Sequence, residues 1–309
     1  AVLRCALAAA ARPGDQRGMS GDLAATAAQR VTVVTVTHDS AGVIAAFLGA
    51  CPAGVARCVV DNASADASAA LAAAAGARVI RNAANLGFGA ACNLGLAAAE
   101  REFVLLANPD ARLSPAAVAA LVAAADAFPD AAILAPGIRD AEGQPVRSWD
   151  AEQRRRRRLP RRRDAEPWPA GPVCVEHVSG ACMLLRRADG LRFDPDFFLY
   201  YEDDDLCAET RRRGRSVVLV PAAVVTHAGG ASSAPSAALL AFKARHMAWS
   251  RLRYMAKHAG AAAARRDAAA RLPHHAGKAL GHALTLRFDR ARADLAGLGG
   301  TLAWLRGRR

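Results

Sequence analysis

The sequence predicts an α/β protein, in which helices flank a mostly parallel central sheet, followed by a basic helical C-terminal region. Short β-branched and apolar runs alternate with helix-like segments over residues 31–135, which is typical of consecutive βαβ units. From residue 237 onward the pattern is helical, amphipathic and basic. With 309 residues, of which 53% are hydrophobic, the chain can form one large domain or two small ones.

The first part of the chain is expected to alternate strands and helices. Serine is a favourable N-cap, so Ser40, Ser64 and Ser114 are expected to begin helices, the last reinforced by Pro115. Gly76 suits a helix C-terminal cap. The helices are expected to end near residues 50, 75, 100 and 128, and the expected strands are 31–37, 55–60, 78–81, 102–107 and 131–135.

The pattern changes after residue 136. A hairpin is expected over residues 137–148, because Glu142 and Gly143 suit its turn. An arginine-rich loop follows. The remaining expected elements are an extended stretch at 173–186, a short helix at 203–213, and strands at 217–220 and 224–227.

Polar side chains follow four successive predicted strands. In open α/β sheets, ligands bind beyond the carboxyl ends of the strands. Acidic and amide residues at four such ends therefore indicate a binding site rather than a packed core. These residues are Asp39, Asp61, Asn62, Asn82, Asn85, Asn108 and Asp110.

Two residues suggest a metal site. Asp110 follows an apolar strand, and a carboxylate there can hold Mg²⁺ or Mn²⁺ that bridges a diphosphate. The alternative is that Asn108-Pro109-Asp110 is an ordinary turn. His227 also ends a strand; it is structural unless it completes the site at Asp110.

The run from Asn85 to Asn93 is rich in small residues. At a helix start, such residues let main-chain N–H groups approach phosphate oxygens. The alternative is close packing of the helix on the sheet. At the second strand end, Asp61 can accept a hydrogen bond from a base or ribose, while Asn62 or Ser64 can instead cap a helix.

Four consecutive acids, residues 202–205, follow an aromatic run. Such a cluster is costly unless the acids have partners or a chemical task. An aspartate here can act as general base toward an acceptor hydroxyl. The alternative is an acidic helix start that the helix dipole stabilises.

Together these segments resemble the family 2 glycosyltransferases, which have the Rossmann-like GT-A fold, and bacterial rhamnosyltransferase-like members in particular. The resemblance extends over residues 31–233, and its strength lies in the order of motifs that are individually weak. The motifs are VVDNAS (59–64), NLGFG (85–89), NPD (108–110), SGA (179–181), YED (201–203), and His227 with Gly229 and Gly230.

The resemblance implies a role for each candidate residue. Asp203 would deprotonate the acceptor hydroxyl, so that one in-line displacement inverts the anomeric carbon. Asp110 and His227 would bind Mg²⁺ or Mn²⁺, although Asn108 stands where the family's metal motif has its first acid. The donor-binding residues would be Thr37, Asp39, Asp61, Asn85, Gly87, Asn93 and Asn108, and the acceptor-side residues Gly180, Ala181 and Glu202.

The same resemblance implies the substrates and the division of the chain. The donor would be a nucleotide-diphosphate sugar, with dTDP-L-rhamnose suggested by the resemblance alone, and the acceptor a cell-envelope glycan or lipid-linked hydroxyl. Residues 1–30 are expected to be a disordered leader. Residues 31–235 would form the catalytic domain, with a donor part (31–135) and an acceptor part (136–235), before the helical region 236–309.

The net charge of +13 leaves two other function classes open. A non-catalytic polyanion- or membrane-binding protein would use the arginine block at 154–163 or the basic tail, which suggests peripheral contact with an anionic membrane. Specific nucleic-acid binding is not expected, because aromatics are not interleaved with the arginines. A nucleotidyltransferase is disfavoured, since no glycine-rich basic loop follows the first strand.

Cysteine usage and hydropathy bear on location. Seven cysteines without a CxxC pair argue against a disulfide framework or zinc knuckle, and favour a reducing cytoplasm. No apolar run reaches the roughly 18 residues of a membrane-spanning helix. We therefore expect a cytoplasmic protein, peripheral on the inner face of the cell membrane.

Overall fold

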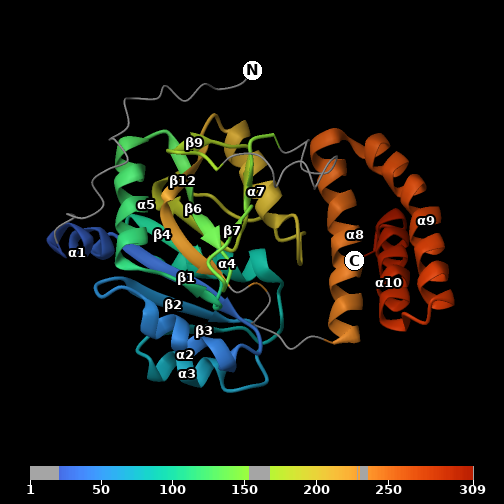
Figure 1. Ribbon diagram of the computed structural model, residues 1–309, viewed down its shortest axis with the longest axis horizontal. Helices are drawn as coiled ribbons and strands as arrows, with labels where there is room; N and C mark the ends of the chain where they lie inside the picture. The colour runs from blue at the N-terminus through green and yellow to red at the C-terminus, as the bar shows by residue number, and fades with distance from the viewer. Residues whose placement is uncertain (1–20, 153–167, 228, 230–235, 309) are drawn as a thin grey trace. The chain divides into compact units, whose positions relative to one another are not determined.

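The computed structural model describes residues 21–152, 168–227, 229 and 236–308 (Figure 1). The chain divides into two compact units, which are treated separately below. The first unit comprises Ala1–Leu86, Ala91–Phe193 and Leu206–Ser233. The second comprises Gly87–Ala90, Asp194–Asp205 and Ala234–Arg309.

A ten-stranded mixed sheet forms the framework of the first unit. Its main path runs β3-β2-β1-β4-β11-β6-β12-β5, while β7 pairs with β6 and β9 with β12. The strands are β1 (Val31–Thr37), β2 (Ala56–Asp61), β3 (Arg78–Arg81), β4 (Phe103–Ala107), β5 (Ala111–Arg112), β6 (Ala131–Arg139), β7 (Pro145–Val146), β9 (Val173–Cys174), β11 (Cys182–Arg186) and β12 (Ser216–His227). A separate two-stranded sheet pairs β8 (Trp149–Asp150) with β10 (His177–Val178).

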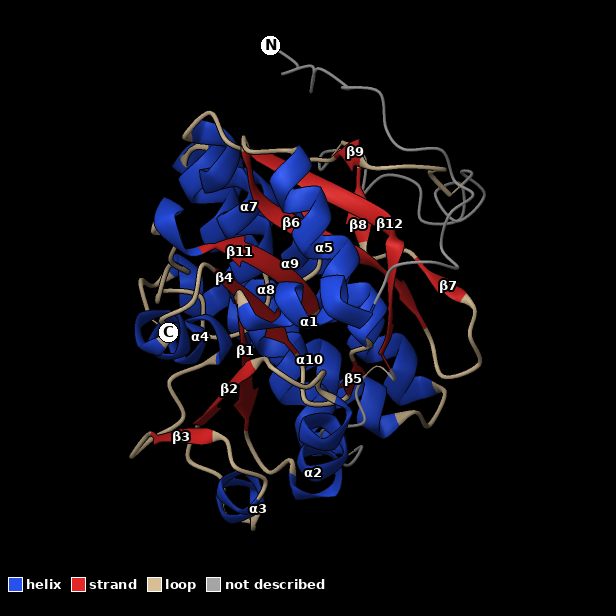
Figure 2. Cartoon of the chain, turned by 90° about the vertical axis from the view of Figure 1, so that its left-hand side faces the viewer, coloured by secondary structure: helices blue, strands red, loops and turns tan. Residues whose placement is uncertain are grey.

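Helices flank this sheet (Figure 2). They are α1 (Gly21–Gln29), α2 (Ala41–Ala50), α3 (Ser68–Ala74), α4 (Phe88–Ala98), α5 (Pro115–Ala127) and α7 (Glu202–Arg212), with a short 3₁₀ turn at Arg187–Asp189. Two of them, α4 and α7, have residues in both units. The predicted α/β class, with helices around a mostly parallel sheet, is confirmed.

Strand direction places the carboxyl ends of β1 to β4 at one edge of the sheet. β1 pairs in parallel with β2 and β4, and β2 pairs in parallel with β3. β11 then enters antiparallel between β4 and β6, and β12 continues parallel to β6. The polar residues that follow β1, β2, β3 and β4 therefore share one edge.

The central strands are almost wholly apolar because both of their faces are covered. All five residues of β4 are buried, and four of the five in β11. Phe103, Ile133 and Leu184 have essentially no exposed surface. Each such side chain contributes about 1.5–3 kcal/mol through burial, so the middle of the sheet is the main source of stability.

The second unit is built mainly from three helices that pack side by side, α8 (Ala237–Ala259), α9 (Ala261–Leu284) and α10 (Phe288–Leu305) (Figure 1). α8 and α10 approach so closely at Gly300 that a Cβ there would lie 2.2 Å from the carbonyl oxygen of Arg245. Arg251 of α8 pairs with Asp267 of α9 at 2.7 Å. The predicted helical C-terminal region is confirmed.

Several local predictions differ from the structure. The disordered leader expected up to residue 30 is wrong for residues 21–29, which form α1. Ser64 does not cap α3; its hydroxyl instead accepts a hydrogen bond from the main chain of Asp39. The two strands expected at 217–220 and 224–227 are one strand, β12, with a register shift between Val220 and Val224.

Some predictions lie outside the described residues, namely the earlier part of the leader, the arginine block at 154–163, and Gly230. Among the described cysteines five are free thiols: Cys51, Cys58, Cys92, Cys182 and Cys207. Cys174 is disulfide-bonded, which the cysteine pattern did not predict. Within the described ranges, none of the helices is both long and apolar enough to cross a bilayer.

Candidate functional site

The first part of the candidate site lies where β1 and β2 end. Thr37 and Asp61 are register partners in the two strands, and both are buried. The hydroxyl of Thr37 donates a hydrogen bond of 3.2 Å to Oδ1 of Asp61. This bond orients the carboxylate at the strand edge, where it can accept a hydrogen bond from a ligand.

Asn62, the next residue, connects three loops. Its Nδ2 donates to Oδ1 of Asn85 at 2.8 Å, and its Oδ1 accepts from Nδ2 of Asn82 at 2.9 Å and from the main chain of Leu86 at 3.0 Å. Its own main-chain N–H donates to the carbonyl of Thr37 at 2.8 Å. Asn62 thus fixes the loop after β3 against the end of β1.

Asp39 joins the loops that follow β1 and β2. It has a left-handed backbone, with φ of 54°, a conformation that aspartate tolerates better than most residues. Its carboxylate accepts a hydrogen bond of 2.7 Å from the main chain of Ala65, and its main-chain N–H donates to Ser64. The predicted donor-binding side chain therefore also shapes the edge of the site.

The second part of the site gathers three polar groups at the ends of β4 and β12. Nε2 of His227 lies 3.1 Å from Oδ1 of Asp110 and 3.2 Å from Nδ2 of Asn108. The side chain of Asp110 is 3% exposed and that of His227 18%. Pairing of β12 with β5 puts His227 opposite Ala111, which explains how residues far apart in sequence meet.

This group suits a divalent cation. A carboxylate oxygen and an imidazole nitrogen are accepted ligands of Mn²⁺, and Mg²⁺ also takes carboxylates. Neighbouring ligands of an octahedral ion at about 2.1 Å lie about 3 Å apart, which agrees with the separation of the Asp110 and His227 atoms. Asp110 and His227 therefore have the ligand types and the spacing that a metal ion requires.

The predicted acceptor-side turn borders this group. Gly180 and Ala181 form the turn that leads into β11. The carbonyl of Ala181 accepts a hydrogen bond of 2.9 Å from the main chain of Asn108. A substrate group near Gly180 would accordingly lie close to the Asn108 backbone.

Two predicted donor-binding residues have structural partners instead. Asn93 holds the main chain of Phe193 with both ends of its amide, each at 2.9 Å. Gly87 has φ of 86°, and a Cβ there would lie 2.4 Å from the carbonyl oxygen of Phe198. These contacts support the close-packing alternative for this glycine-rich run.

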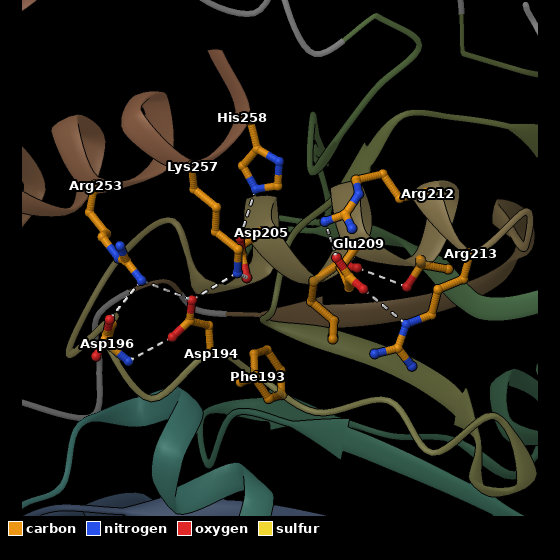
Figure 3. Close-up of polar contacts among 12 residues, drawn as sticks. Phe193, Asp194, Asp196, Asp205, Glu209, Arg212, Arg213, Arg253, Lys257 and His258 are labelled. Atoms are coloured by element: carbon orange, nitrogen blue, oxygen red, sulfur yellow. Dashed lines mark hydrogen bonds and ion pairs between the residues drawn. The ribbon is translucent and has the colours of Figure 1, made fainter. Parts of the chain in front are cut away.

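The acidic run opens α7, and its members have different environments. Glu202, Asp204 and Asp205 are buried, whereas Asp203 is partly exposed. Asp205 lies 2.9 Å from the ammonium of Lys257 and 2.7 Å from Nε2 of His258 (Figure 3). Asp205 is therefore a structural acid, whereas Asp203 is the partly exposed member of the run.

Asp203 has one main-chain hydrogen bond, and the backbone before it is unusual. Its Oδ1 accepts a hydrogen bond of 2.9 Å from the main chain of Asp204. The preceding residues, Tyr200 and Tyr201, both have φ of 68°, which is unusual for bulky side chains. Strained backbone of this kind costs about 1–3 kcal/mol per residue and is often found at functional sites.

The buried carboxyl of Glu202 has a shifted pKa. Burial raises the pKa of the Glu202 carboxyl well above its usual value, and the negative charges of Asp203 and Asp204 raise this pKa further. Oε2 of Glu202 is buried without a hydrogen-bond partner. A carboxyl that keeps its proton is a poor base, which again favours Asp203 for that role.

The fold and these residues define an α/β protein with a candidate site at the strand ends, and comparison with known proteins specifies the family. The model of glycosyl transferase family 2 matches residues 32–189, just over half of the chain. The chain therefore belongs to glycosyl transferase family 2.

A curated relative is the N-acetylglucosaminyl-diphospho-decaprenol L-rhamnosyltransferase of Mycobacterium tuberculosis, for which two strains give the same match. It is 29% identical over 212 residues, covering 54% of this chain and 66% of the relative. The chain thus spans just under two thirds of that relative's length.

Solved structures show the same fold at low sequence identity. A mannosyltransferase from Pyrobaculum calidifontis, in complex with GDP-Man and Mn²⁺, has a TM-score of 0.54 at 17% identity, covering 91% of this chain and 88% of its own. The glucosyl-3-phosphoglycerate synthase of Mycobacterium tuberculosis, with Mn²⁺ and UDP, has a TM-score of 0.52 at 20% identity, with coverage of 79% and 85%. The predicted GT-A fold is confirmed.

The structure brings together some of the predicted residues and separates others. Thr37 contacts Asp61, Asn85 joins them through Asn62, and Asn108 meets Asp110 and His227. Glu202 and Asp203 belong to the second unit. The sequence places Asn62 at a strand end and offers it as a helix cap, but it does not predict the hydrogen bonds that join Asn62 to Asn82 and Asn85.

Proposed function

We propose that the protein is an inverting, metal-dependent glycosyltransferase that moves a sugar from a nucleotide-diphosphate donor to a hydroxyl group. The observation that carries this proposal is the pairing of Asp110 with His227, beside Asn108, at the edge of the sheet where Thr37 and Asp61 also end. A buried carboxylate and a partly buried imidazole there suit a cation that would bind a diphosphate.

The donor would be held by the residues at the ends of β1 to β4. Asp61, oriented by Thr37, would accept a hydrogen bond from the base or ribose. Asp39 would lie beside the nucleotide, and Asn85, positioned by Asn62, would line the same edge. Gly87 and Asn93, predicted as donor contacts, would act through the main-chain segments that they support.

Asp110 and His227 would hold Mg²⁺ or Mn²⁺, with Asn108 beside them. The ion would supply positive charge that stabilises the leaving diphosphate. The burial of Asp110 excludes water from the ligand atoms and so strengthens this electrostatic effect.

Asp203 would take the proton from the acceptor hydroxyl as that oxygen attacks the anomeric carbon. The bond between this carbon and the diphosphate oxygen then breaks on the opposite side, which inverts the configuration. Asp203 is the partly exposed member of the acidic run, while Asp205 is engaged by Lys257 and His258. Gly180, Ala181 and Glu202 would border the acceptor.

The substrate classes are proposed from likeness to the rhamnosyltransferase described above. The donor sugar would be rhamnose, carried as dTDP-L-rhamnose, and the acceptor a lipid-linked or cell-envelope glycan. The protein would then act in cell-envelope biosynthesis at the cytoplasmic face of the membrane. Residues 31–135 would serve the donor, residues 136–235 the acceptor, and 236–309 would form a separate helical region.

The proposal is tested by calorimetric titration of dTDP-, UDP- and GDP-sugars with and without Mn²⁺. Binding of one donor that requires the metal is expected. If the folded protein binds none of these donors under either condition, the proposed donor class is wrong.

A substitution tests the base. Asp203→Asn should lower the rate of transfer about 100- to 10,000-fold while donor affinity is retained, because general base catalysis contributes about that factor. Glu209→Gln, on the same helix, is the matched control and should keep full turnover. Normal turnover in the Asp203 variant would show that another group is the base.

A further inference from the structure

The turn between α9 and α10 exposes an unusual concentration of apolar side chains. Among the described residues, the four most exposed large hydrophobic side chains all lie within this stretch of nine residues. They are Leu280, Leu284, Leu286 and Phe288, at 62%, 76%, 75% and 65% exposure. We refer to these four residues as the apolar tip of the second unit.

The backbone conformation of the turn disfavours a leucine at position 286. The main-chain N–H of Leu286 donates to the carbonyl of Ala283 at 3.0 Å, and that of Arg287 to His282 at 2.8 Å. These two bonds form a Schellman motif, whose left-handed position usually holds glycine. Leu286 occupies this position with φ of 56°. A leucine here is strained and gains nothing from packing, so neither folding nor stability accounts for it.

Basic side chains surround the apolar tip. Arg287, Arg290 and Arg292 are exposed, with one exposed acid, Asp289, among them; Lys278 is half exposed and lies 3.5 Å from Asp294. The wider segment 236–309 carries 15 Lys and Arg residues against 3 Asp, so it holds +12 of the chain's formal charge of +13. The partner that covers the tip must therefore be apolar at its centre and negatively charged around it.

We infer that the apolar tip docks on the surface of an anionic phospholipid bilayer. Leucine and phenylalanine side chains would enter the boundary between headgroups and acyl chains, while the arginines would bind lipid phosphates. A second copy of this chain would bring like charges together at Arg287 and Arg290. Nucleic acid would match the charge, but it offers aliphatic leucine no stacking partner. The inference does not rest on the proposed function, because membrane binding needs no donor.

Flotation of the full-length protein with lipid vesicles tests this surface. The protein should float with vesicles of phosphatidylcholine mixed with phosphatidylglycerol, less with phosphatidylcholine alone, and less as salt is raised. The triple variant L284S/L286S/F288S should partition at least about tenfold more weakly, since it loses three apolar side chains and no charge. Leu23→Ser, at another exposed leucine, is the matched control and should float like the unmodified protein.

A single variant separates membrane binding from folding. Leu286→Asn should weaken flotation without lowering the midpoint of thermal unfolding, because asparagine tolerates the left-handed backbone. Flotation of the triple variant equal to that of the unmodified protein would overturn the inference. A protein that binds duplex DNA but floats with neither kind of vesicle would also overturn the inference. That result would assign the basic surface to nucleic acid.

Discussion

Two of the aspartate–histidine pairs among the described residues, one from each unit, differ in their surroundings. Asp110 and His227 lie 3.1 Å apart, with the amide of Asn108 beside the imidazole. Asp205 and His258 lie 2.7 Å apart, and Asp205 also pairs with the ammonium of Lys257 (Figure 3). We expect the same two side chains to have different roles in the two pairs, depending on the third group.

The residue beside each aspartate–histidine pair determines how much of its charge is already compensated. This residue is Lys257 in one pair and Asn108 in the other. Lys257 supplies a permanent cation to Asp205, and Asp194 joins the same ammonium at 2.8 Å, so the cluster is a fixed ion-pair network. Asn108 supplies only a dipole to His227. We expect the first kind of pair to contribute to stability and the second kind to ligand binding.

The largest effect is expected for Asp205→Asn. Removing this carboxylate, whose side chain is 3% exposed, leaves Lys257 and His258 without their shared partner. Breaking a buried pair of this kind costs about 3 kcal/mol, measured as the free energy of unfolding in urea. Asp289→Asn, at an exposed acid of the same unit, should change it by less than about 0.5 kcal/mol. Equal unfolding midpoints for the two variants would mean that the Asp205 network is not a structural one.

For Asp110→Asn we expect weaker ligand binding with little change in stability. Loss of the carboxylate should lower metal-dependent donor affinity about 100-fold, because even outer partners of metal sites contribute about 10- to 100-fold. The free energy of unfolding should change little. Calorimetry with and without Mn²⁺ measures the affinity, and the Asp205 variant, studied below its unfolding temperature, serves as the control. Unaltered metal dependence in the Asp110 variant would remove the distinction between the two pairs.

A smaller effect, visible as a pH dependence, is expected for Glu202→Gln. Burial raises the pKa of Glu202 in the folded protein, so the folded state keeps a proton that the unfolded state loses above about pH 4.3. The stability contributed by this group is complete below that pH and is lost as the pH rises through the folded-state pKa. Glutamine has no proton to lose, so the stability of the variant relative to the unmodified protein should grow with pH. Parallel curves of unfolding free energy against pH would contradict this.

Much of the first unit followed from local sequence. The β-branched run at 31–37 and the Ser114-Pro115 start are locally determined, and both gave the predicted elements. The position of polar residues at strand ends also followed, because parallel strands share an edge. The long-range partners of Asp205 could not be predicted from the sequence. Lys257 and His258 lie more than 50 residues after Asp205, and nothing near the acidic run indicates them.

Two other predictions differ from the structure because of contacts between residues far apart in sequence. The run of small residues at Gly87 predicts room for a phosphate, but the sequence does not indicate that the backbone of Phe198 occupies that room. Ser64 has the chemistry of a helix cap, and its hydroxyl instead joins the loop at Asp39. In each case a local preference is satisfied by a group that only the tertiary structure brings near.

The side chain of Asn93 fixes the backbone of Phe193 at the point where the chain leaves the first unit. Its amide accepts from the N–H and donates to the C=O of Phe193, as an adjacent β-strand would, and Phe193 is the last residue before the chain leaves the first unit. One side chain thereby fixes both the position and the direction of the exit. The segment that follows, which contains Asp194 and Asp196, therefore begins from a fixed backbone position.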